Sequence, residues 1–118
     1  MSTPITTNFV VMRNDDLPVI VTFKDDNGVV VDITGSTCFF TVKENNTDLD
    51  INAKIAKSWA IHLDPSNGIT QFNLVPADTV NLLGRYYFDI QVKLVSGLIY
   101  TPVHGIFTVL ADSTLRIV

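Results

Sequence analysis

The chain has 118 residues and a formal net charge of −4, and its eight lysines and arginines form no cluster that could line a nucleic-acid groove. A single cysteine, Cys38, excludes an internal disulfide framework. No apolar run approaches the ~18 residues of a membrane span, and no charged-then-apolar leader opens the chain. We therefore expect one domain, made and folded in a reducing cytosol, with neither nucleic acid nor a membrane as its partner.

The predicted elements begin with a flexible lead, residues 1–7. Valine, isoleucine and threonine supply 39 residues, and the acidic residues are eleven aspartates and one glutamate, a balance that favours strands and turns over helices. Alternating or apolar stretches predict strands over residues 8–13, 18–25, 29–33, 36–44, 53–63, 69–75, 85–95 and 98–109. Turn signals stand at Asn27-Gly28, at residues 64–68 and at Ser96-Gly97. A polar loop is expected at 45–52, and a helical turn at 76–82, where a proline opens the segment.

Alternation within three of these strands gives each of them an inward face. The residues expected inside are Val19, Val21 and Phe23; Cys38, Phe40 and Val42; and Tyr86, Phe88, Ile90, Val92 and Leu94. The sequence therefore predicts an all-β fold, a single immunoglobulin-like β-sandwich of seven to eight antiparallel strands over residues 1–118.

The stretch Leu83-Gly84-Arg85-Tyr86 resembles the tyrosine corner of immunoglobulin-like sandwiches. In that motif an inward tyrosine at the start of a late strand bonds its hydroxyl back to the preceding connection. We expect Tyr86 to take this role, and the alternative is a tyrosine packed by its ring alone.

Four segments in this order carry a resemblance to a known family: FVVMRNDD, VTFKDDNGVVVDITGSTCFFTVKE, GITQFNLVPADT and GRYYFDIQVKLVSGLIYTPVHGIFTVLAD. Together, over roughly residues 8 to 112, they resemble the immunoglobulin-like domain at the N-terminus of phage baseplate upper proteins and in related tail and virion proteins. Each motif alone is a generic sandwich signal, and the order and spacing of the set are more specific.

The resemblance implies a structural protein that joins parts of a phage particle and has no catalytic residues. Its partners would be other virion proteins, and its location the virion, after synthesis in the host cytoplasm. In the family, further chain such as a coil or a receptor-binding region often follows the domain, whereas this sequence stops at Val118. A complete small virion protein and an excised domain both stay open.

Metal ligands are weighed first among the possible sites. Asp48-Leu49-Asp50-Ile51-Asn52 has the start of a calcium loop, but Ala53 and Trp59 stand where an EF-hand needs glycine and glutamate. The two histidines and one cysteine do not suggest a zinc set, which needs three or four ligands. We expect no metal and no cofactor.

Catalysis has equally little support in the sequence. No serine lies in a G-x-S-x-G elbow, and the paired aspartates, such as Asp15-Asp16, are adjacent in turns where they face water. A pair of carboxylates across a cleft stays open as an alternative. We expect a protein that is not an enzyme.

The last two strands are apolar on both faces. A two-residue loop at Ser96-Gly97 would pair Val95 with Leu98 and, counting outward, Tyr87 with Ile106. This register would place a contiguous aromatic patch on the face away from the core. This predicted interface contains Phe39, Tyr87, Tyr100, Pro102 and Ile106. The alternatives are scattered exposed apolar residues or a second layer from the termini. Pro102 cannot donate to a ladder, so it predicts either a sheet edge or a bulge.

These features predict a non-enzymatic structural component of a phage tail, baseplate or other virion appendage, which assembles as a homo-oligomer. The alternative is a carbohydrate-binding module that contacts host-surface glycan through Tyr87, Tyr100 or Trp59. A bacterial adhesin or regulatory immunoglobulin-like domain is a third possibility, and the lack of an export signal disfavours it.

Overall fold

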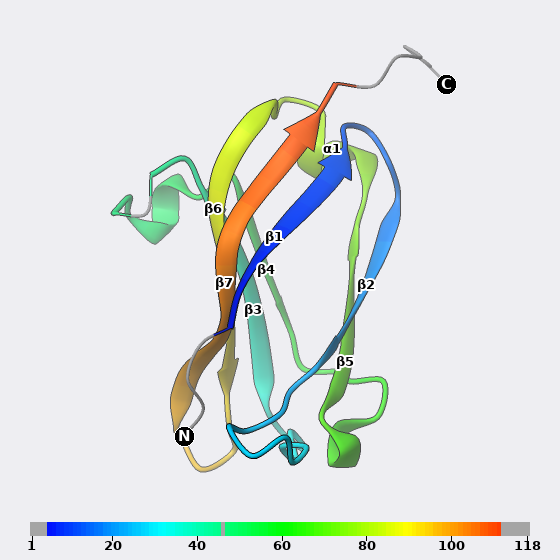
Figure 1. Ribbon diagram of the computed structural model, residues 1–118, viewed down its shortest axis with the longest axis vertical. Coiled ribbons are helices and arrows are strands. Elements are labelled where there is room, and N and C mark those ends of the chain that lie inside the picture. The colour runs from blue at the N-terminus through cyan, green and yellow to red at the C-terminus, as the bar shows by residue number, and fades with distance from the viewer. Residues whose placement is uncertain (1–4, 46, 112–118) are drawn as a thin grey trace.

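The computed structural model of the protein describes residues 5–45 and 47–111, and these form a β-sandwich of two sheets (Figure 1). Its strands are β1 (Ile5–Met12), β2 (Leu17–Thr22), β3 (Thr37–Lys43), β4 (Ile55–Trp59), β5 (Ile69–Leu74), β6 (Gly84–Lys93) and β7 (Ile99–Leu110). Short helical turns are η1 (Asp50–Asn52), η2 (Pro65–Asn67) and α1 (Pro76–Thr79). One sheet has the order β1-β7-β6-β3-β4, and the other pairs β2 with β5. The predicted all-β sandwich is confirmed.

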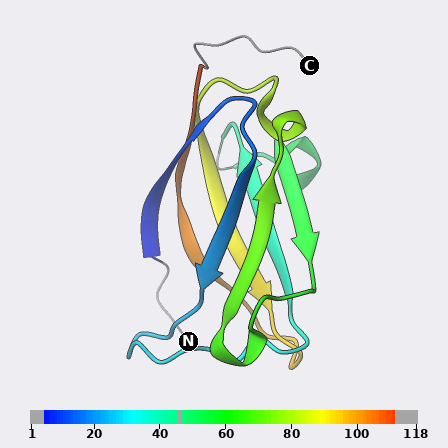
Figure 2. The ribbon, with the colours of Figure 1, turned by 90° about the vertical axis from the view of Figure 1, so that its right-hand side faces the viewer.

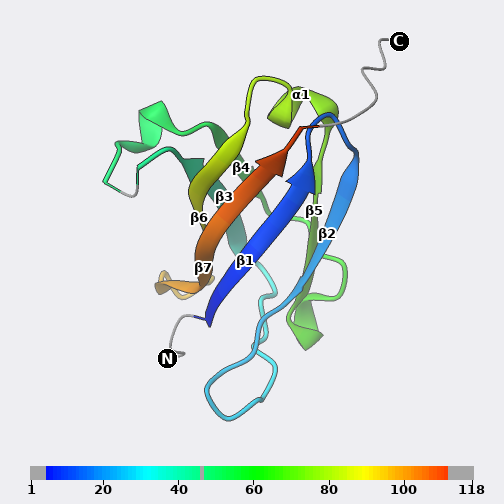
Figure 3. The ribbon, with the colours of Figure 1, turned by 45° about the horizontal axis from the view of Figure 1, so that its top comes forward.

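The first and last strands of the sandwich lie side by side (Figures 1 and 3). β1 runs parallel to β7, with Ile5 opposite Val103 and Met12 opposite Leu110, whereas every other strand pair is antiparallel. The expectation of a wholly antiparallel sandwich therefore needs this one correction. Phe9 and Val11 of β1 pack on the core, while Val10 and Met12 face outward.

Two expectations near the start of the chain are wrong. β1 already begins at Ile5, so part of the lead predicted at 1–7 is a strand, and residues 1–4 lie outside the described residues. Residues 29–33 form no strand, and only Val30 makes an isolated bridge, to Lys24. The carboxylate of Asp25 accepts the backbone N–H groups of Asn27 and Val29, and this local turn takes the place of a ladder.

The core lies between the two sheets, as Figure 2 shows with β2 and β5 in front of the larger sheet. Phe40 is fully buried, and its ring centroid lies 4.6 Å from Phe72 of the small sheet and 6.0 Å and 5.9 Å from Phe88 and Phe107 of the large one. These aromatic contacts join the two sheets. All residues expected inside are buried or pack on the core, which confirms the predicted inward faces.

One glycine makes room for β1. Gly105 of β7 lies opposite Thr7, and its backbone is not left-handed, so the need here is for space. A Cβ at this position would overlap the carbonyl oxygen of Thr7 and would lie 2.7 Å from its carbonyl carbon. Only glycine lets the two backbones approach so closely.

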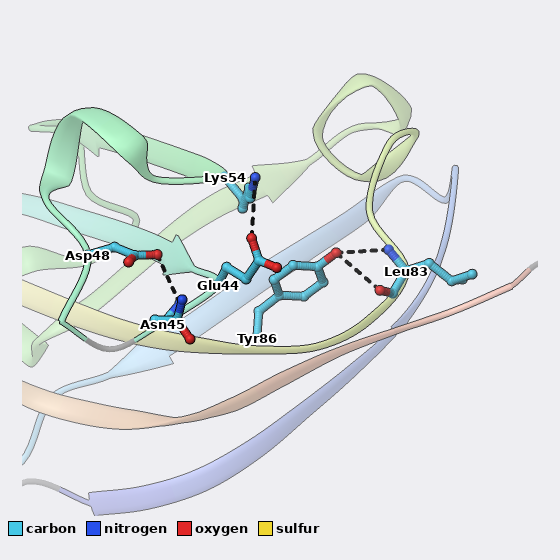
Figure 4. Close-up of polar contacts among 6 residues, drawn as sticks. All are labelled: Glu44, Asn45, Asp48, Lys54, Leu83 and Tyr86. Carbon is cyan, nitrogen blue, oxygen red and sulfur yellow. Dashed lines mark hydrogen bonds and ion pairs between the residues drawn. The ribbon is translucent and has the colours of Figure 1, made fainter.

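The predicted tyrosine corner is present (Figure 4). The Tyr86 hydroxyl accepts a hydrogen bond from the N–H of Leu83 and donates one to the carbonyl oxygen of Leu83, both at 3.1 Å. The two bonds fasten the connection after α1 to the start of β6.

Tyr86→Phe is expected to lower the free energy of unfolding by ~1 kcal/mol, the usual net value of a hydrogen bond, because it removes only the hydroxyl. Urea unfolding measures the change. Tyr87→Phe is the matched control, since this neighbouring ring lies on the outer face of the sheet, and it is expected to leave stability unchanged. Equal stability of Tyr86→Phe and the wild type would show that the corner contributes nothing.

Candidate functional site

The candidate site lies on the outer face of the five-stranded sheet, the face turned away from β2 and β5. One row across this face joins Lys43, Tyr87, Ile106 and Asn8, from β3, β6, β7 and β1. Tyr87 and Ile106 are direct cross-strand partners, as expected, and the tyrosine keeps 42 % of its surface exposed. Phe39 is on the same face but two rows away, opposite Gln91 and Ser58.

Two of the predicted interface residues lie elsewhere. Tyr100 pairs with Val92 on the core side and packs against the core, and this burial raises the pKa of its phenol. Pro102 is buried as well. Both corrections have one cause, which is that the pairing of β6 with β7 shifts by one residue between Ile90 and Val92.

The register of this hairpin contains two irregularities that cancel. The loop has three residues rather than two, because the N–H of Leu94 donates to the carbonyl oxygen of Leu98, so the pairing expected for Val95 is wrong. Thr101 and Pro102 then oppose the single residue Gln91. This arrangement is a β-bulge, which was one of the two structures expected at Pro102. Beyond the bulge the register returns to the expected one. The alternative of a free edge is wrong from Val103 onward, since β1 pairs there.

A polar row separates Phe39 from the Tyr87 row. Asp89 is half-buried between Thr41 and His104, and burial raises the pKa of its carboxyl while the nearby charges of Lys43 and His104 oppose that change. His104 is also 3.1 Å from the hydroxyl of Thr6. The expected continuous aromatic patch is therefore interrupted.

The apolar surface continues instead toward the ends of β1 and β7. Arg85, Tyr86, Tyr87 and Ile106 line an open hollow of about 280 Å³. Beyond it, exposed apolar side chains stand on β1 and at the end of β7. We define the outer patch as Val10, Met12, Arg85, Tyr87, Ile106 and Leu110. The sequence did not indicate the contribution of β1, because nothing in its alternation showed that it joins β7.

The opposite end of the sandwich carries a second apolar surface. The β2–β3, β4–β5 and β6–β7 connections gather at this end (Figures 1 and 2). Their exposed apolar side chains form what we call the loop end: Val29, Val30, Ile61, Leu63, Val95 and Leu98. Ile61 and Val95 are 88 % and 82 % exposed. All six residues fall within predicted strands, where the sequence gives no sign that they project into solvent.

Hydrogen bonds join the β2–β3 connection of the loop end to the β4–β5 connection. The N–H of Ile33 donates to the carbonyl oxygen of Pro65 at 2.9 Å, which joins the β2–β3 and β4–β5 connections. A Cβ on Gly35 would lie 3.5 Å from the side chain of Val95, so the β2–β3 connection also contacts the β6–β7 loop. Two of the three connections of the loop end are thus hydrogen-bonded to each other, and the β6–β7 loop lies beside them.

A serine and a histidine also meet near this end, but their geometry is that of a structural brace. The Nε2 of His62 lies 3.1 Å from the hydroxyl of Ser36 and 2.9 Å from the carbonyl oxygen of the same residue. Its Nδ1 lies 2.9 Å from the hydroxyl of Thr70, which accepts the indole N–H of Trp59. No carboxylate orients the ring in these contacts, and Ser36 is 0 % exposed, so a substrate cannot reach its hydroxyl. Burial raises the pKa of the Cys38 thiol to about 11, which keeps it protonated.

The calcium-like segment serves local structure. Asp48 accepts the backbone N–H of Asn45 (Figure 4), and Asp50 pairs with Lys43 at 2.7 Å. Within residues 5–45 and 47–111, no three histidine, cysteine or acidic side chains gather as a metal site would require. The same part of the chain contains no helix long and apolar enough to cross a membrane.

Neither a protein-family model nor a curated protein matches this chain.

Proposed function

We propose that this protein is a non-enzymatic building block of a phage particle, from the tail, baseplate or another virion appendage. It assembles with copies of itself and with other virion proteins. Two features support the proposal: the order of its sequence segments, which resembles that of phage virion domains, and its all-β sandwich of two sheets.

The observation that carries the assembly role is the cross-strand pair of the exposed Tyr87 and the half-buried Ile106, which lies in the hollow of the outer patch. A half-exposed tyrosine beside an isoleucine and an arginine has the composition that is enriched at the centres of protein interfaces. The arrangement supports glycan binding less well. Of the three aromatic residues considered for that role, Trp59 stacks on Phe72 at 4.9 Å and Tyr100 packs on the core.

Tyr87→Asp tests the assembly role. If the outer patch meets another chain, the new carboxylate must be buried without a partner on association, which costs several kcal/mol. We expect a folded monomer where the wild type forms oligomers, measured by light scattering after size exclusion and checked by thermal unfolding.

Gln91→Asp is the matched control, because it introduces the same charge into the same strand and face but outside the outer patch. It should assemble like the wild type. A monomeric wild type, or a Tyr87→Asp variant that assembles normally, would refute the assembly role. Membership of a phage particle is tested separately by immunoblotting purified particles, and absence from them would refute it.

A further inference from the structure

We infer that copies of this chain associate head to tail, with the loop end of one copy docked on the outer patch of the next. This inference rests on the proposed assembly role of the outer patch. It adds that the partner is a second copy of the chain and that this copy presents its loop end.

Charge is the first reason to pair these two surfaces. The connections that form the loop end carry four aspartates, Asp25, Asp26, Asp32 and Asp64, against Lys24 and the adjoining Lys93, a net charge of −2. Hydrogen bonds from the hydroxyl and the backbone N–H of Thr34 lower the pKa of Asp32, so this charge persists in mild acid. The loop end is therefore an apolar surface with an acidic surround.

The outer patch has the complementary charge where it includes β6, whereas Asp15 adjoins Val10 and Met12 at its other edge. Its one charged member is Arg85, which is exposed and lines the hollow beside Tyr87. An arginine next to apolar groups suits a partner that offers carboxylates around aliphatic side chains. Two loop ends facing each other would instead bring eight aspartates together, which disfavours a symmetric contact between loop ends.

Position is the second reason. β6 begins at the end of the sandwich that carries the outer patch and finishes at the loop end, so the two surfaces lie toward opposite ends of the strands (Figure 1). One copy can therefore use both surfaces at once. Such a contact between unlike surfaces closes into a ring or continues as a filament. The hydrogen bonds between the β2–β3 and β4–β5 connections reduce the conformational entropy that these loops lose on docking.

Complementation between two variants tests the inference with the full chain. Val95→Asp disrupts binding through the loop end, and Tyr87→Asp disrupts binding through the outer patch. Each variant alone is expected to be monomeric. An equimolar mixture should form dimers and nothing larger. The intact loop end of the Tyr87→Asp copy can bind the intact outer patch of the Val95→Asp copy. The two surfaces left free in this dimer both carry the introduced aspartate, so no third copy can bind. Sedimentation velocity distinguishes these species, and thermal unfolding of each variant verifies folding.

The possible results distinguish a failure of the head-to-tail pairing from a failure of the assembly role of the outer patch. If Val95→Asp assembles like the wild type while Tyr87→Asp does not, the outer patch is an interface but the head-to-tail pairing is wrong. If the mixture stays monomeric, the pairing is also wrong. If the wild type is monomeric, both proposals fail.

Arg85→Glu probes the charge argument. Lys54→Glu is a control that makes the same charge change on an exposed lysine, which belongs to neither surface and pairs with Glu44. We expect Arg85→Glu to weaken association at least ~10-fold and the control to leave it unchanged. Equal effects of the two variants would overturn the role assigned to Arg85.

Discussion

Gly105→Ala is expected to detach β1 from β7 and to lower the free energy of unfolding by ~3–5 kcal/mol, at the upper end of what one substitution does. The added methyl group would occupy the place of the Thr7 carbonyl. This neighbour is backbone rather than a flexible side chain, so β1 as a whole must move. Its movement would withdraw Phe9 and Val11 from the core.

Hydrogen exchange locates this effect. The amides of β1 should lose protection in Gly105→Ala while those of β3 keep it, and urea unfolding gives the total change. Gly97→Ala is the control, because a Cβ there meets no atom within 4 Å and only the left-handed backbone at φ +93° is strained. That strain costs ~1–2 kcal/mol. If both variants lowered the free energy of unfolding by the same small amount, the close approach of β1 to Gly105 would be contradicted.

Phe40→Ala is expected to destabilise the protein by ~3–5 kcal/mol, from the lost burial of the ring and the cavity left behind. Its side chain is fully enclosed among Phe72, Phe88 and Phe107. Single domains typically have a free energy of unfolding of ~5–15 kcal/mol, so this loss is a large fraction of the total.

Phe39→Ala supplies a matched control one residue away. The same ring is removed from the same strand, but on the outer face, so we expect a loss below ~1 kcal/mol in urea unfolding. Equal losses at the two positions would contradict the assignment of the faces of β3.

Much of the fold was predictable, because strand alternation is a local property of the sequence. The inward positions of β3 and β6 follow from apolar residues at every second position, and Tyr86 follows from its place after a short turn. The turn and strand assignments failed where a side chain competes with the ladder, as Asp25 does by closing a turn on Val29. The parallel pairing of β1 was not predictable, since it joins residues nearly a full chain apart.

The candidate site was less predictable than the fold, because it depends on register. Tyr87 and Ile106 are partners only because the three-residue loop and the bulge at Pro102 cancel. Tyr100 lies between these two irregularities and therefore faces the core. The loop end was missed for another reason, which is that aliphatic residues such as Ile61 have the same local pattern whether they are buried or exposed.

The parallel pairing of β1 with β7 also decides how the domain responds to mechanical tension. The described chain enters β1 at Ile5 beside Val103 and leaves β7 at Leu110 beside Met12. Tension applied between these two points along the strands would slide β1 past β7. All the bonds of this eight-residue ladder would then resist together in shear, instead of opening one after another as in a zipper. A chain held by its two ends would therefore yield by sudden release of a whole strand, at a force well above that which peels a hairpin.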